Sequence, residues 1–453
     1  MPSLLTIPPE ILHRVFFYAD QESRKALRLS SVLLGETGRS WIFQTTTISR
    51  VKSICARFEN ILDRPDIVNA VTKIYLDTID PDDGNGSVTT EDGDEFLEAS
   101  EEDEDDDSAL PPRFWKLVNR LSEFPRLQSV VIRFDPKCEE EDDWGDAQQT
   151  KEFRAAVLKK AFSVIAALPR LPKELGIQDL QNINPTDEET VGDINKVLGG
   201  LQRLRLNNAN ELDEGNGENN VEKQAIHDFY PSLASTWLLP ALTNLEHLSI
   251  YSSIYWGFNP IADLETAHFP RLKSLALGNY TFVRDAQLEW ILSLGETLEE
   301  LYLDDCPILF EVAIYPDTKP RTSLDPNSYK DHPKFQRKTH AYYNTRWADY
   351  LRAFNERLPH LKHFRLGHNP HWWEDDTTPF EKEDQIRIKF YESYMVYCDG
   401  FGPSQYMERL IYDSTEGYDD GEKLKPSEED EAALKELLTK LGQTVDEDDD
   451  YYY

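Results

Sequence analysis

A short alternation of hydrophobic and other residues recurs along the chain: Leu, two residues, Leu or Val, one residue, then Leu or Ile. Clear copies span 127–132, 201–206, 245–250, 272–277, 298–303 and 361–366, and weaker copies span 71–76 and 172–177. The alternation within each copy is that of a short strand with one buried face. Its recurrence indicates a solenoid in which each repeat buries the next.

The spacing of the copies and the segments between them support an α/β architecture. Several copies lie one or two units of about 20 to 29 residues apart, and longer gaps indicate insertions. Apolar residues at three- and four-residue spacing predict helices packed on the strands over 115–121, 153–168 and 288–292. The alternative is an ordinary α/β protein with amphipathic strands, which the shared register of the clear copies disfavours.

The first fifty residues predict a separate helical unit. Pro8 and Pro9 are tolerated only at the start of a helix. Glu10 suits the positive end of the helix dipole. A second apolar helix is predicted over 24–34, and Trp41 closes the unit.

This unit resembles an F-box, the module that binds a Skp-type adaptor. Ile7-Pro8 stands for the usual Leu-Pro, and Glu10-Ile11-Leu12 matches directly. The other matching positions are Val15-Phe16, Tyr18, Leu29-Ser30 and Trp41, while the chain departs from the usual phrase at Ala19, Glu22-Ser23 and Ser31. The alternative is a helix that only caps the solenoid, as terminal repeats require.

With the repeats, the chain resembles fungal F-box proteins with irregular leucine-rich repeats. The resemblance implies a substrate receptor of an SCF-type ubiquitin ligase, which binds the Skp adaptor and the cullin scaffold. Such a subunit has no catalytic residues of its own, and its role is to hold a client near the transferred ubiquitin. The residues expected to bind the adaptor are Ile7, Pro8, Glu10, Ile11, Leu12, Val15 and Phe16.

Client binding is expected on side chains that alternate with the buried leucines of the repeat strands. Such residues point away from the core, and in this family's fold they line the concave face. Tyr and Arg are favoured anchors of protein interfaces. The expected exposed residues are Arg133, Arg205, His247, Tyr251, Tyr302, Asp304 and Arg365.

The net charge of the chain limits which classes of partner it can bind. The 453-residue chain carries a net charge of −36, which argues against nucleic acid because phosphate binding needs a basic surface. Acidic runs over 80–107, 139–146 and 446–450 predict solvated, disordered segments or docking arms for a basic partner. The alternative function is therefore an acidic leucine-rich-repeat protein that binds a basic client such as a histone, without a link to a ligase.

The other candidate chemistry is weak. The four cysteines are scattered along the chain, so disulfides are not expected, and the chain is expected in the cytoplasm or nucleus. No leader peptide and no membrane-spanning segment are expected. Basic and aromatic residues alternate in an insertion over 307–347, where a lid over the repeats, or contact with the chain's own acidic loops, is preferred to nucleic-acid binding. His360, His363, His368 and His371 are not expected to converge on one ion, so neither a metal nor another cofactor is predicted.

Three regions follow from these patterns. Residues 1–48 form the F-box-like unit, and residues 49–412 form the irregular repeats with insertions at 80–108 and 307–347. Residues 413–453 form an acidic tail that contains a helix over 427–441. Ser427 can cap this helix, and Gly442 can end it.

Overall fold

The structure is a computed structural model, and its described residues fall into two compact units. Unit 1 comprises Met1–Asp135, Glu152–Ile177 and Asp187–Gly200, and unit 2 comprises Pro136–Lys151, Gln178–Thr186 and Leu201–Tyr453. The described residues are 7–79, 110–138, 149–210, 212–213, 218–219, 223–333, 337–372, 378–399, 402–404 and 425–446. The acidic insertion 80–108, the run 139–146 and nearly all of the terminal run lie outside them.

Unit 1 begins with helices α1 (Pro9–Tyr18), α2 (Gln21–Ser30) and α3 (Val32–Ile42). Leu12, Phe16 and Leu34 form their core. The single helix expected over 24–34 is wrong. Ser31 has an extended backbone, and its hydroxyl accepts a hydrogen bond from the Leu34 N–H, so the chain ends one helix and starts another there.

Close packing of α1 on α3 depends on Gly38, and this gives a test of the helical core. A Cβ at this position would lie 2.6 Å from the Phe16 ring. We expect Gly38→Ala to destabilise the helical unit by about 1–3 kcal/mol, because the buried ring has little room to shift. Gly192→Ala is the matched control: α8 (Glu188–Leu198) has open space there, and the change should stabilise by about 0.5–1 kcal/mol. Equal thermal melting shifts for the two variants would contradict this packing.

The remainder of unit 1 pairs parallel strands with helices. Strands β1 (Thr45–Ile48), β2 (Lys73–Asp77) and β3 (Ser129–Arg133) pair in that order. Helices α4, α5, α6 and α7 span Lys52–Leu62, Pro65–Val68, Pro112–Val118 and Lys151–Ala166. β4 (Glu174–Gln181) follows α7 and precedes α8. The helices predicted over 115–121 and 153–168 are confirmed within a few residues.

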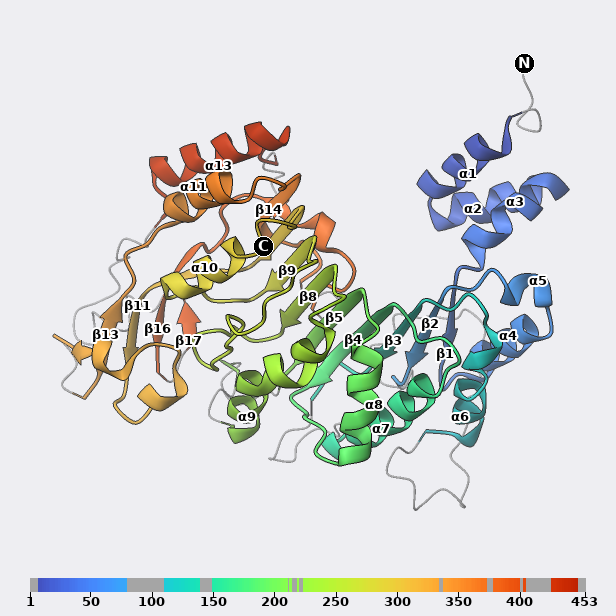
Figure 1. Ribbon diagram of the computed structural model, residues 1–453, viewed down its shortest axis with the longest axis horizontal. Helices are drawn as coiled ribbons and strands as arrows, with labels where there is room; N and C mark the ends of the chain where they lie inside the picture. The colour runs from blue at the N-terminus through green and yellow to red at the C-terminus, as the bar shows by residue number, and fades with distance from the viewer. Residues whose placement is uncertain are drawn as a thin grey trace. The chain divides into compact units, whose positions relative to one another are not determined.

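Unit 2 contains the parallel strands that carry the clearest sequence copies (Figure 1). They pair in the order β5 (Arg203–Ala209), β8 (His247–Ser252), β9 (Ser274–Gly278), β10 (Glu300–Asp304) and β14 (His363–His368). Equivalent positions of the sequence copies lie side by side on neighbouring strands. One such row is buried and consists of Leu204, Leu248, Leu275, Leu301 and Phe364. The predicted α/β class is confirmed, and the sheet of the repeat strands is mostly parallel.

The other elements of unit 2 surround these strands. Helices α9 (Gln224–Leu233), α10 (Asp285–Leu292) and α11 (Trp347–Arg357) connect them, and β6 (Leu212–Asp213) pairs with β7 (Glu218–Asn219). β15 (Arg387–Ile388) pairs antiparallel with β14. Among the described residues no helix combines the length and apolarity needed to cross a bilayer.

The insertion 307–347 supplies most of a second sheet in unit 2. Its order is β12 (Lys330–Asp331), β13 (Thr339–Tyr342), β11 (Ile308–Ile314), β16 (Tyr394–Cys398) and β17 (Gly402–Ser404). The described residues of the insertion therefore contribute strands to this sheet, and the structure shows a different segment on the repeat strands.

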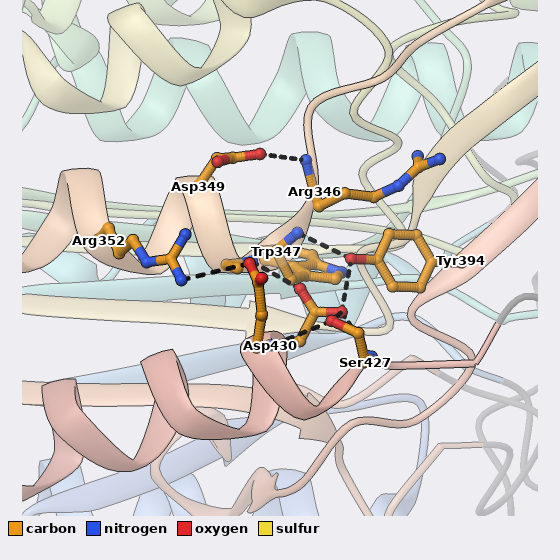
Figure 2. A network of polar contacts seen from close by, with 9 residues as sticks. Arg346, Trp347, Asp349, Arg352, Tyr394, Ser427 and Asp430 are labelled. Carbon is orange, nitrogen blue, oxygen red and sulfur yellow. Dashed lines mark hydrogen bonds and ion pairs between the residues drawn. The ribbon is translucent and has the colours of Figure 1, made fainter.

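The predicted C-terminal helix is confirmed as α13 (Glu428–Leu441), which packs on α11. Ser427 caps it, and Gly442 ends it in the left-handed region with φ of 69°. The buried Asp430 carboxylate accepts hydrogen bonds from the Ala348 N–H (2.7 Å) and the Tyr394 hydroxyl (3.0 Å), as Figure 2 shows in part. This carboxylate joins α13 to the start of α11 and to β16.

Candidate functional site

One side of the unit 2 strands, here called the strand face, carries most of the residues expected to bind a client. Strand register places its central row as Arg205, Ser249, Ala276, Tyr302 and Arg365. On adjoining rows, Asn207 lies beside Tyr251, and Gly278 lies beside Asp304. The alternation in the sequence therefore identifies which side chains share a face.

The expectation that these residues are exposed is wrong. Asp304 and Tyr251 are 0% and 1% exposed, and Tyr302 and Arg205 are also buried. Arg133, His247 and Arg365 are half-buried. In unit 1 the Arg133 guanidinium lies 3.8 Å from the Asp77 carboxylate. In unit 2 the cause is a second layer of chain, the covering segment, of which residues 369–372 and 378–388 are described.

Hydrophobic contacts hold the covering segment on the middle of the strand face. The Trp372 ring lies 5.8 Å from the Tyr251 ring, centroid to centroid. Trp372 and Ile386 form one buried cluster with the strand-face residues Tyr251, Ala276 and Tyr302. The segment thus removes from water the aromatic side chains that looked most suited to an interface.

Polar contacts hold the covering segment at both ends of the strand row. On β5, the Asn207 side chain donates to the Thr378 hydroxyl and to the Pro379 carbonyl, both at 2.7 Å. On β14, the Arg365 guanidinium donates to the Ile386 carbonyl at 2.6 Å. The segment therefore reaches across the face from β14 to β5 and returns to form β15.

The charged contact under the segment joins Arg205 to Glu383. The Arg205 Nε donates to a Glu383 carboxylate oxygen at 3.1 Å, and His247 Nε2 lies 3.8 Å from the same oxygen. Burial alone would raise the pKa of Glu383, but His247 and the Arg205 charge outweigh it, so this pKa lies well below its ordinary value. Glu383 is thus held as a carboxylate, and it neutralises a buried Arg205.

Asp304 anchors the start of the covering segment. One of its oxygens accepts from the Asn369 N–H at 2.9 Å and from the Trp372 indole N–H at 2.8 Å. Burial raises the pKa of Asp304 well above its usual range, and the adjacent Asp305 adds to the rise. Asp305 itself lies 2.8 Å from the His368 ring nitrogen.

Replacing Asp304 by Asn should raise the melting temperature, and more so at neutral than at acidic pH. A carboxyl whose folded pKa is raised loses stability as pH rises from its unfolded value of 3.8 through its folded value. Asn keeps the accepting oxygen and removes this titration, so the gain should be larger near pH 7 than near pH 4. Asp66→Asn is the control, because exposed Asp66 pairs with Arg64 and its pKa is lowered. A gain from Asp304→Asn that is the same at both pH values would contradict a buried titrating carboxyl.

The residues expected to bind the adaptor divide into two sets. Leu12 and Phe16 are buried in the core of the helical unit, so the expectation that they lie on a docking face is wrong. Ile11 and Val15 are 46% and 37% exposed. Pro8 and Glu10 are exposed, and Ile7 is half-buried.

The structure adds exposed residues that the sequence expectation did not include. The N-terminal apolar surface, as named here, comprises Ile11, Val15, Phe17, Tyr18, Leu29, Val32 and Leu33. Leu29 and Val32 are 84% and 81% exposed. Most of the exposed large hydrophobic residues in the described part of the chain belong to this surface. Exposed apolar residues gathered in this way make the helical unit a candidate interaction site. Tyr18 and Leu29 already matched the F-box phrase, which was the available sequence signal.

The four clustered histidines have separate surroundings. His363 accepts from the Arg365 Nε at 3.2 Å, His368 contacts Asp305, and His371 contacts the Gln385 side chain. His360 is exposed. His363, His368 and His371 thus take part in the strand face and its cover, where each contacts a different residue.

A scan of protein-family models matched none to this chain, and a search of curated proteins matched no sequence.

Proposed function

We propose that this chain is a substrate-recognition subunit of an SCF-type ubiquitin ligase. The observation that carries the proposal is the N-terminal apolar surface on a helical unit whose residues follow the F-box phrase. In this proposal a Skp-type adaptor covers that surface and links the chain to a cullin scaffold. The irregular leucine-rich repeats hold the client.

The two kinds of residue in the F-box phrase have separate tasks under this proposal. Leu12 and Phe16 build the helical core. Ile11, Tyr18 and Leu29 also match the phrase, yet they remain exposed and are free to contact a partner. Exposing such residues has no benefit for folding, since burial of apolar surface is the main stabilising term. A bound partner would bury these apolar side chains and so explain why they are exposed in the chain alone.

The covering segment restricts how a client can bind. Its contacts with Asn207, Arg205 and Arg365 occupy the polar groups of the strand face. A client therefore either displaces the segment from the strand face or binds the outer surface that the segment presents. In both cases the chain supplies position, and the partner enzymes supply the chemistry.

The proposal can be tested by affinity purification of the tagged chain from cells of the organism that produces it. The proteins that bind to the chain are then identified. We expect a Skp-type adaptor and a cullin among the partners, together with a client that accumulates when the proteasome is inhibited. Recovery of basic proteins such as histones without adaptor or cullin would instead favour an acidic binding protein unconnected with a ligase.

A further inference from the structure

The second sheet of unit 2 brings two histidines and a glutamate to one point. Glu311 lies on β11, His340 lies on β13, and His332 directly follows β12. Ala313 pairs with His340, and His340 pairs with Lys330. Since alternate residues of a strand share a face, Glu311, His340 and His332 project from the same side of the sheet.

The separations between these side chains fit ligands of one ion better than hydrogen-bonded partners. His340 Nδ1 and His332 Nε2 lie 3.5 Å and 3.8 Å from the same Glu311 oxygen, Oε1. Each group offers a ligand atom, and these atoms all lie within 4.8 Å of one another. Good N–H···O hydrogen bonds are about 2.7–3.2 Å long. Two ligands of a tetrahedral ion with bonds of about 2.1 Å lie roughly 3.4 Å apart.

The burial of these three side chains and the charge of a glutamate carboxylate also favour a bound cation. The side chains of His332, Glu311 and His340 are 0%, 3% and 11% exposed. His340 Nδ1 makes no hydrogen bond within the described part of the chain. A carboxylate removed from water needs a positive counter-charge. A divalent cation bound between the carboxylate and the two imidazoles supplies that charge.

We propose that Glu311, His332 and His340 bind one zinc ion. Two imidazole nitrogens and one carboxylate oxygen form a ligand set that suits zinc, and three protein ligands leave the fourth position to water. The ion fastens the β12–β13 hairpin to β11. This hairpin needs such a fastening, because β12 has only 2 residues. The His332 N–H to Lys338 carbonyl hydrogen bond (3.0 Å) continues their pairing just beyond β12. The site is independent of the proposed ligase role.

A second acidic and histidine group in unit 2 does not carry the same inference. Asp304, Asp305 and His368 also place ligand atoms near one another. Here, however, Asp305 contacts His368 directly at 2.8 Å, and one Asp304 oxygen accepts two hydrogen bonds from the covering segment. Asp305 and His368 are thus already partners of each other, and one Asp304 oxygen is already used in holding the covering segment.

Zinc titration of the purified, metal-stripped full chain against a chromogenic zinc chelator tests the site. We expect one tight site per chain, and Co²⁺ in its place should give the intense visible absorption of a tetrahedral ion rather than the weak bands of an octahedral one. Zinc should raise the melting temperature by about 3 °C or more when present at 100 times its dissociation constant. It should also slow tryptic cleavage after Arg337, which lies in the hairpin.

Single-ligand variants locate the site. Glu311→Gln, His332→Gln and His340→Gln should each weaken zinc binding by about 100-fold or more, because each removes one of the three protein ligands. His268→Gln, at an exposed histidine, and His368→Asn should bind zinc as the wild type does. A wild-type chain without a tight zinc site would overturn the proposal, as would tight binding that survives all three ligand changes. If a ligand variant fails to fold, the cobalt spectrum and the zinc-dependent melting of the wild type still decide.

Discussion

A full-length chain with Ile11→Asp, Leu29→Asp and Val32→Asp should lose at least about 100-fold in affinity for a Skp-type adaptor. These side chains are 46%, 84% and 81% exposed, so they are available to a partner. A buried apolar anchor of an interface contributes about 2 kcal/mol or more, and a carboxylate in its place would also have to lose its water. Calorimetric titration with purified adaptor measures the loss.

The same exposure makes this variant informative, because exposed substitutions leave the fold nearly unchanged. Each should alter stability by no more than about 0.5 kcal/mol. Leu239→Asp is the matched control: Leu239 is 40% exposed but lies in unit 2, outside the N-terminal apolar surface. It should bind the adaptor normally. Wild-type affinity in the triple variant would show that the N-terminal apolar surface does not bind the adaptor.

Trp372→Ala should destabilise unit 2 by about 3–5 kcal/mol and release the covering segment. The indole is buried against the Tyr251 ring, and its N–H donates to Asp304. Its loss leaves a cavity and a buried carboxylate oxygen with one donor fewer. Hydrogen exchange should rise at Thr378 and across 382–388, and denaturant unfolding should report the free-energy change.

Trp372→Phe separates packing from hydrogen bonding at this position. It keeps an aromatic ring near Tyr251 but removes the donor to Asp304, so it should cost about 1–3 kcal/mol. Unchanged hydrogen exchange over 378–388 in Trp372→Ala would show that the segment does not depend on the indole.

The strands could be predicted from the sequence because their information is local. In 245–250, for example, Leu248 and Ile250 alternate with other residues, and this spacing alone places both side chains in the core. The same spacing recurs in each copy, and the copies pair in register in the parallel sheet. The C-terminal helix was predictable for a similar reason, since Ser427 and Gly442 are its own local end signals.

The cover on the strands could not be predicted in this way. Alternation shows that Tyr251 and Asp304 point away from the helices, but it does not show what lies on the other side. Trp372 and Ile386, which bury them, are distant in the sequence and carry no pattern that names their partners. The contact depends on tertiary packing alone.

The helix boundary at Ser31 and the histidine–glutamate cluster are two further features that the sequence alone did not predict. Ser31 separates α2 from α3 because its side chain caps the start of α3, whereas a serine can also lie within a helix. Glu311 meets His340 only because β11 and β13 pair in a particular register, with an irregularity next to Glu311 where β11 also pairs with β16. Residue spacing along the chain does not specify that pairing.

Adaptor binding can be measured by mixing the purified chain with a purified Skp-type adaptor and separating the mixture by size-exclusion chromatography with light scattering. We expect one complex with equal numbers of the two chains, and we expect no complex with the Ile11, Leu29 and Val32 triple variant. If the two proteins elute separately at concentrations well above the dissociation constants of known adaptor complexes, the chain does not bind a Skp-type adaptor.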